Sequence, residues 1–125
     1  MGIKRTKTVN VKQILANTDH FFSVGTMVND AGVVAENGRK IIKAGTPLGG
    51  ATKTIADSTA ILSVVDDGTV QGVALFDVDV TEGKGNASLL IWGFVNEFRL
   101  DSSVTINDAV KKALDGKVTF VKRNK

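Results

Sequence analysis

Hydrophobic and polar residues alternate along much of this chain, which is typical of β-strands with one buried face. In Val70–Val80 every second residue from Ala74 onward is apolar, with Phe76 among those expected to face inward. Ala87–Val95 is apolar on both parities from Leu89 onward, so we expect both of its faces to be covered. The turn residues between these segments predict a β-hairpin over 70–95. Strand character is also found in Phe21–Val28, Ile41–Ile42, Ala60–Val65 and Lys117–Val121.

One short α-helix is predicted near residues 105–115. Thr105 or Asn107 can cap its start, and Gly116 supplies the left-handed residue that commonly follows a helix. The spacing i, i+3, i+4, i+7 and i+8 places one apolar stripe along it, made of Ile106, Ala109, Val110, Ala113 and Leu114. The fold class is therefore mainly β, a small sandwich or barrel-like domain, with this helix and an extended N-terminal arm.

The glycine-rich segment Gly45–Thr54 has some features of a phosphate-binding loop. In such loops the lysine directly follows the second glycine, whereas here two residues separate Gly50 from Lys53. We predict a β-turn and loop, with Pro47 presetting the backbone of the turn.

The chain divides into three parts by composition. Residues 1–19 form an arm, because Ile3, Val9 and Val11 share one parity but offer too little apolar surface to fold alone. Residues 20–121 form a single β-rich domain, and residues 122–125 form a basic tail. A length of 125 residues suits one domain, and no apolar run approaches the roughly 20 residues of a membrane span. We expect a soluble protein made in the cytoplasm, since the N-terminus lacks the apolar region of a secretory signal.

Charge is concentrated at the two ends of the chain. Residues 1–12 and 117–125 each carry four bases and no acid, which leaves eight of the sixteen bases against all thirteen acids between them. Basic ends favour phosphate or an acidic protein surface as partner, although solvated ends would show the same pattern.

Candidate catalytic groups are few. The chain has one histidine, His20, no cysteine and no Gly-x-Ser-x-Gly motif, so thiolate chemistry is excluded and an enzyme is not expected. Asp77, Asp79 and Glu82 invite a calcium interpretation, but glycine and glutamate are missing at the sixth and twelfth positions of the loop. We predict a solvated acidic face, with no metal and no cofactor.

Three segments occur in an order that resembles a known family: Ile41–Gly50, Val70–Val80 and Leu89–Asn96. They contain Lys-Ala-Gly-Thr-Pro-Leu, Gly-Val-Ala-Leu-Phe-Asp-Val and Gly-Phe-Val, respectively. This series resembles the head decoration and head-fibre-type proteins of tailed phages, including the lambda-type capsid decoration proteins. The resemblance covers about residues 41–100. The strongly basic ends depart from the lambda-type pattern.

The resemblance implies a non-enzymatic virion protein that binds the outer surface of a phage capsid and stabilises the head. Its partners would be the major capsid protein and further copies of itself, as a homotrimer, with no membrane and no specific nucleic acid. Trp92 and Phe94 become candidates for subunit contacts. The candidates for capsid contact, through strand pairing of the arm, are Ile3, Lys4, Arg5, Lys7, Val9 and Val11.

Two other functions remain open from the residues alone. A small nucleic-acid-binding β module could use the basic termini, although aromatic residues are 6% of the chain and none alternates with those bases. A carboxylate–metal enzyme would rely on Asp77, Asp79 and Glu82.

Overall fold

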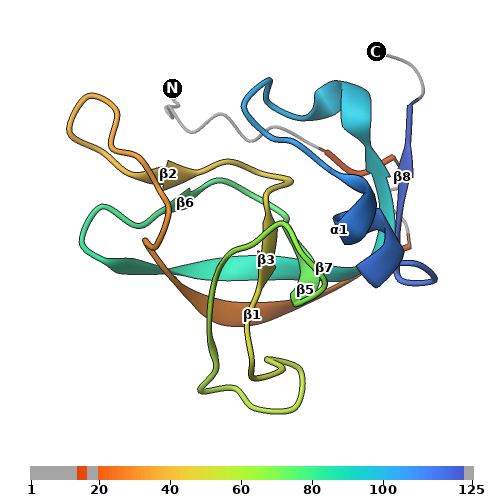
Figure 1. Ribbon diagram of the computed structural model, residues 1–125, viewed down its shortest axis with the longest axis horizontal. Helices are drawn as coiled ribbons and strands as arrows, with labels where there is room; N and C mark the ends of the chain where they lie inside the picture. Colours follow the sequence, from red (N-terminus) through yellow and green to blue (C-terminus); the bar gives the residue numbers. More distant parts are fainter. Residues whose placement is uncertain (1–13, 17–19, 123–125) are drawn as a thin grey trace, which may run out of the picture.

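A computed structural model describes residues 14–16 and 20–122, and its centre is a closed five-stranded β-barrel (Figure 1). The strand order is β1-β4-β3-β5-β7, and the ring closes because β7 pairs with β1 as well as with β5. The predicted fold class, mainly β and barrel-like with one short helix, is confirmed. The barrel strands are β1 (Phe22–Asn29), β3 (Pro47–Gly49), β4 (Ile61–Val64), β5 (Val70–Ala74) and β7 (Lys84–Asn96).

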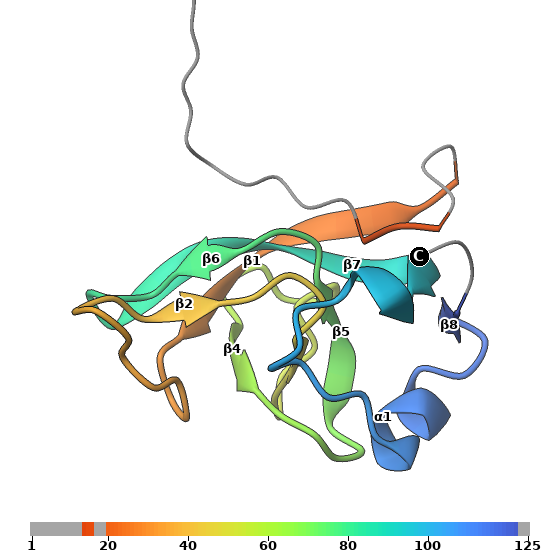
Figure 2. The ribbon, with the colours of Figure 1, turned by 90° about the horizontal axis from the view of Figure 1, so that it is seen from above.

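The remaining elements are attached to the two ends of this barrel (Figure 2). At one end β8 (Val118–Val121) runs parallel to the last residues of β7, and α1 (Asp108–Ala113) lies nearby. A 3₁₀ turn, Glu97–Arg99, follows β7. At the other end a two-stranded ribbon is formed by β2 (Ile41–Ile42) and β6 (Val78–Asp79).

The long β1–β7 pairing sets the length of the molecule. It is antiparallel and extends from Phe22 opposite Trp92 to Asn29 opposite Lys84. β5 packs closely on β7 because Gly72 has no side chain: a Cβ there would collide with the carbonyl oxygen of Leu90. The sequence around Gly72 therefore has a steric reason to contain glycine.

Two groups of buried apolar side chains fill the interior. One lies near α1 and β8 and the other near the β2–β6 ribbon, with β5 and β7 contributing to both. The first group contains Ile14, Leu15, Ala44, Val70, Val73, Leu75, Leu90, Val95, Val110, Leu114 and Val118. The second contains Val28, Ile42, Leu48, Leu62, Ala74, Val78, Val80, Ala87 and Leu89.

The helix is present but shorter than the predicted 105–115. Asn107 caps it, since its side-chain oxygen accepts from Val110 N at 2.9 Å while its amide donates to Asp66 O at 2.9 Å. Val110 and Leu114 are fully buried. Gly116 has a φ of 79°, the left-handed conformation expected after the helix.

The predicted strand over Val70–Val80 is wrong in its middle. β5 ends at Ala74 and β6 begins at Val78, so that Leu75 is buried whereas Phe76 is 41% exposed. The side chain of Asp77 accepts from Ala44 N at 2.8 Å at this bend, and the chain then leaves β7 to pair with β2. The β5 part of the predicted hairpin with β7 is confirmed.

The segment predicted to be turn and loop around Pro47 contains a strand. β3 is three residues long, fully buried, and lies between β4 and β5. Pro47 is its first residue, where a missing N–H is tolerated, and its carbonyl accepts from Val65 N at 3.2 Å. The strand conformation of these three residues follows from their pairing with β4 and β5 rather than from an alternating pattern of apolar and polar residues.

The chain joins the barrel earlier than the division at residue 19 implies. Ile14 and Leu15 are buried in the first core group, and Leu15 pairs with Val95 of β7. Asn96 N donates to Ile14 O at 2.9 Å, and Ala16 N donates to Phe94 O at 2.8 Å. Residues 14–16 therefore belong to the domain.

Candidate functional site: the aromatic face and the adjoining groove

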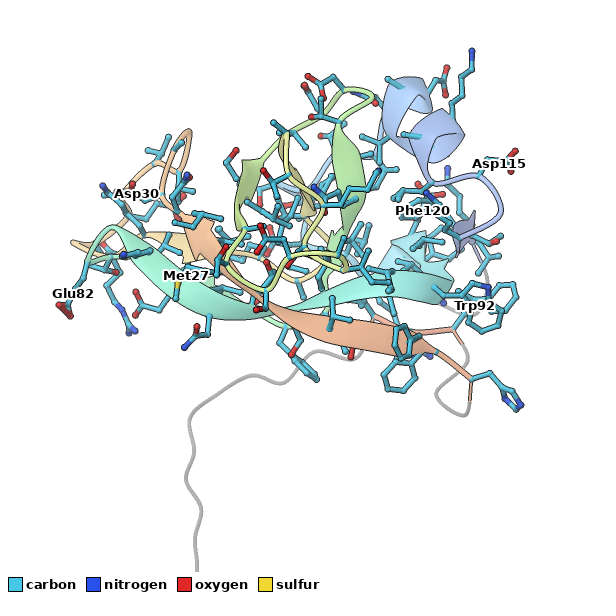
Figure 3. All side chains as sticks on the ribbon, turned by 90° about the horizontal axis from the view of Figure 1, so that it is seen from below. Met27, Asp30, Glu82, Trp92, Asp115 and Phe120 are labelled. Atoms are coloured by element: carbon cyan, nitrogen blue, oxygen red, sulfur yellow. The ribbon has the colours of Figure 1, made fainter. Side chains whose placement is uncertain are left out.

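Four aromatic residues gather at the end of the β1–β7 ladder where Phe22 lies opposite Trp92. We call them the aromatic face: Phe21, Phe22, Trp92 and Phe94. Phe22 and Trp92 lie opposite each other and are 54% and 44% exposed. The Trp92 and Phe94 rings meet edge to face, with centroids 6.0 Å apart and an interplanar angle of 73°. Figure 3 shows Trp92 at the end of the sheet. The expectation that both faces of this strand are covered is wrong for Trp92 within one chain.

The backbone at Gly93 allows the aromatic side chains to approach. A Cβ at Gly93 would lie 3.2 Å from the Cβ of Phe21, closer than nearly all real contacts. Gly93 N also donates to Lys117 O at 3.0 Å, which ties β7 to the start of β8. The absence of a side chain at Gly93 therefore lets Phe21 lie against β7, while the backbone N–H of the same residue pairs β7 with the start of β8.

Beside the aromatic face lies a groove of about 250 Å³. A register shift between Phe22 and Ser23 in the β1–β7 pairing, typical of a β-bulge, lets the consecutive residues Ile91 and Trp92 both line it. Ile55, on its opposite wall, is 62% exposed. The complete lining is Lys53, Thr54, Ile55, Val70, Gln71, Ile91, Trp92 and Lys117.

The polar wall of the groove is held in place by internal hydrogen bonds. The Gln71 amide donates to Gly50 O and Thr52 O at 3.2 and 2.8 Å, and its oxygen accepts from Thr54 N at 2.9 Å. Thr54 Oγ1 donates to the buried Thr26 Oγ1 at 2.8 Å. Because Gln71 and Thr54 are hydrogen-bonded within the chain, the main polar groups that the groove presents to a ligand are the positive charges of Lys53 and Lys117. Neither lysine has an ion-pair partner in the described part of the chain.

The acidic residues at the other end are engaged in local structure rather than merely solvated. Asp79 accepts from Arg39 Nη2 at 2.7 Å and from the N and Oγ1 of Thr81. These hydrogen bonds, that of Arg39 foremost, hold the pKa of Asp79 well below its ordinary value. Asp77 binds Ala44 N, and Glu82 lies exposed in the turn before β7. Among residues 14–16 and 20–122, no three histidine or carboxylate side chains gather as metal ligands would.

A loop beyond the end of β1 was not recognised from the sequence. We call residues 31–36 the Val34 loop, because Val34 is 79% exposed. Glu36 and Arg39 exchange backbone hydrogen bonds of 2.7 and 3.0 Å around Asn37 and Gly38, whose φ values are 54° and 79°. Asn-Gly is the sequence signal of this two-residue turn, and it could have predicted the feature.

The predicted site residues divide into two groups. Trp92 and Phe94 are brought together in the aromatic face. Ile3, Lys4, Arg5, Lys7, Val9 and Val11 lie outside the described residues. His20 is exposed next to Phe21. Ile55, Lys53 and Lys117 were missed because they reach Trp92 only through barrel closure and the pairing of β8 with β7. Phe22 was missed because its place opposite Trp92 depends on the pairing of β1 with β7.

Comparison with known proteins gives no match, either to a protein-family model or to a curated protein. In the described residues no helix is long and apolar enough to cross a membrane.

Proposed function

We propose that this chain is a non-enzymatic structural protein of a virion, which binds the outer surface of a tailed-phage head and reinforces the shell. The observation that supports this most is the pair Phe22 and Trp92, two large aromatic side chains exposed on the outside of the barrel. Aromatic side chains are enriched in protein interfaces and carry much of their binding energy.

The position of the N-terminal segment favours the same function. Leu15 pairs with Val95, and Ala16 N binds Phe94 O, so the segment joins the barrel beside the aromatic face. A partner surface at this end could therefore contact the aromatic face and the exposed Ala16 together. The bases Lys4, Arg5 and Lys7 and the strand-forming residues around them suit an acidic sheet edge of the major capsid protein.

Co-sedimentation with phage heads tests this proposal. Expanded heads assembled from the major capsid protein of the same phage should retain the full chain. Phe22→Ala should bind more weakly by tenfold or more, as expected for an exposed aromatic residue of an interface, and Phe22 does not line the groove. Ile61→Ala is the matched control, since Ile61 is 50% exposed on β4, outside the aromatic face. Equal retention of both variants, or no retention of the full chain, would contradict the proposal.

A nucleic-acid-binding module is the second candidate function, and one observation favours it. Trp92 lies in a groove with Lys53 and Lys117, an arrangement that can stack a base between cationic side chains. Titration with single-stranded DNA at two salt concentrations separates the candidates. Binding that falls steeply with salt and requires Trp92 would favour this second function over head binding.

A further inference from the structure

The groove has the dimensions and chemistry of a receptor for protein side chains. Its volume of about 250 Å³ is below the roughly 300–1,000 Å³ usual for small-molecule pockets, but it can admit one or two aliphatic side chains. Ile55, Ile91 and Trp92 provide apolar contact, whereas Lys53 and Lys117 provide positive charge. A matching segment would carry an exposed aliphatic residue close to a carboxylate.

The Val34 loop carries both features. Val34 is the most exposed large hydrophobic residue described, and Glu36 follows two residues later with no ion-pair partner among the described residues. The base of the loop is held by the ion pair of Lys40 Nζ with Asp30 Oδ2 at 2.7 Å and by the Asn-Gly turn.

We propose that the groove of one copy of this chain receives the Val34 loop of a second copy. Val34 would pack on Ile55 and Trp92, and Glu36 would approach Lys53 and Lys117. The inference deepens the proposed function, because it specifies how neighbouring copies on a shell contact one another.

The two surfaces lie at opposite ends of the molecule, which requires the contact to be between copies. β1 extends from Phe22, opposite Trp92, to Asn29, just before the Val34 loop, a span of about 23 Å. Figure 3 shows Trp92 and Asp30 at opposite ends of the molecule. Contacts between two different surfaces join copies head to tail and close into a ring when the rotation between neighbours permits.

Charge argues against the chain's own N-terminal residues as the occupant. Residues 1–12 carry Lys4, Arg5, Lys7 and Lys12 without an acid, so they would be repelled by Lys53 and Lys117. The phosphates of a nucleic acid could pair with the two lysines but would leave the exposed Ile55 without an apolar contact. Binding of a nucleic acid is therefore an alternative outcome of the test.

Cysteine cross-linking tests the contact directly, because the chain contains no cysteine of its own. Ile55→Cys and Val34→Cys proteins are mixed at high concentration under mild oxidation, with Ile61→Cys and Val34→Cys as the matched control pair. We expect a mixed disulfide dimer to dominate in the first mixture, and a chain carrying both changes to give a ladder of linked copies. Cross-linking no greater than in the control would overturn the proposal, as would a predominance of Ile55–Ile55 dimers.

Charge reversal provides a second, reversible test. Glu36→Lys or Lys117→Glu should weaken self-association about threefold or more, and the chain with both changes should recover it. Lys112→Glu on α1 is the control, with the same change of charge outside the groove. If the double variant does not recover self-association, the proposed contact is wrong. The contact is also wrong if single-stranded DNA displaces the second copy and its binding requires Lys53 and Lys117.

These results are distinct from those that test head binding. A chain that binds heads but shows no groove-to-loop cross-link would overturn this inference and leave the proposed function standing. Copies that cross-link as expected but never bind heads would support the contact and overturn the proposed function.

Discussion

Phe22 and Trp92 lie directly opposite each other on β1 and β7, and about half of each side chain remains exposed to solvent. Cross-strand aromatic pairs usually stabilise a sheet by covering apolar surface. Here the pair lies outside two filled core groups, and the groove begins at Trp92. The contribution of these side chains to folding should therefore be small compared with their contribution to binding.

Replacing Trp92 separates these contributions. Leu90 is fully buried two residues earlier, and Leu90→Ala should lower the free energy of unfolding by about 2–5 kcal/mol. Trp92→Ala should cost less than Leu90→Ala but should weaken self-association more. Urea unfolding and sedimentation equilibrium of both variants measure the two effects. A larger stability loss for Trp92→Ala would show that it is primarily a core residue.

Gly72 tests the close packing of β5 on β7. Gly72→Ala should destabilise the protein by about 1–3 kcal/mol or more, because the added Cβ meets the Leu90 carbonyl oxygen. Gly68→Ala is the control, since an added Cβ there contacts nothing within 4 Å. Thermal unfolding of the two variants should differ clearly, and equal melting temperatures would contradict the barrel geometry at this point.

The pattern of residues predicted those parts of the fold that local chemistry determines. The cap at Asn107, Gly116 and the apolar stripe are sufficient for α1, and runs of strand-forming apolar residues are sufficient for β1 and β7. β3 could not be predicted, because three residues give no period and its partners β4 and β5 lie later in the chain. The break after Ala74 depends on Asp77 binding Ala44, a contact between residues 33 positions apart.

The candidate site was predictable only in part, for the same reason. The aromatic character of Trp92 and Phe94 marked one strand as apolar on both parities. The groove needs Lys53, Trp92 and Lys117 together, and this juxtaposition follows from barrel closure and from the parallel pairing of β8.

Stability should fall in acid because of the carboxylates at the ribbon end. Hydrogen bonds from Arg39 and Thr81 lower the pKa of Asp79, and the hydrogen bond from Lys40 lowers that of Asp30. A lowered folded-state pKa gives stability that is present above the ordinary value of 3.8 and is lost as the pH falls below it. Unfolding measured from pH 6 to pH 2 should show this loss, and Asp79→Asn should reduce its slope. An unchanged slope would show that Asp79 does not contribute to the loss of stability in acid.

Calcium should not affect folding. Asp77 and Asp79 already accept hydrogen bonds from Ala44, Arg39 and Thr81. Of the three candidates this leaves only Glu82, which is exposed in the turn before β7. A ligand that binds the folded state must raise its melting temperature. We expect equal melting temperatures with calcium and with chelator, and a rise of several degrees with calcium would contradict this prediction.

Deleting residues 2–12 should leave the fold intact and weaken head binding. Ile14–Ala16, which pair with β7, remain in the truncated chain. Ordering eleven residues costs roughly 1–2 kcal/mol each, which Ile3, Val9 and Val11 cannot offset without a partner. A melting scan and head co-sedimentation measure both effects. Unfolding of the truncated chain would place the segment in the domain's own sheet, and undiminished head binding would place attachment elsewhere.

The central claim, reinforcement of a phage head, is tested most directly by heating purified expanded heads with and without the full chain. We predict that the chain binds their outer surface to saturation and raises the temperature at which the shell is disrupted. Phe22→Ala, which leaves the groove lining unchanged, should at the same concentration bind less and give a smaller rise than Ile61→Ala. Heads that fail to bind the chain, or that bind it and are disrupted at an unchanged temperature, would contradict the account.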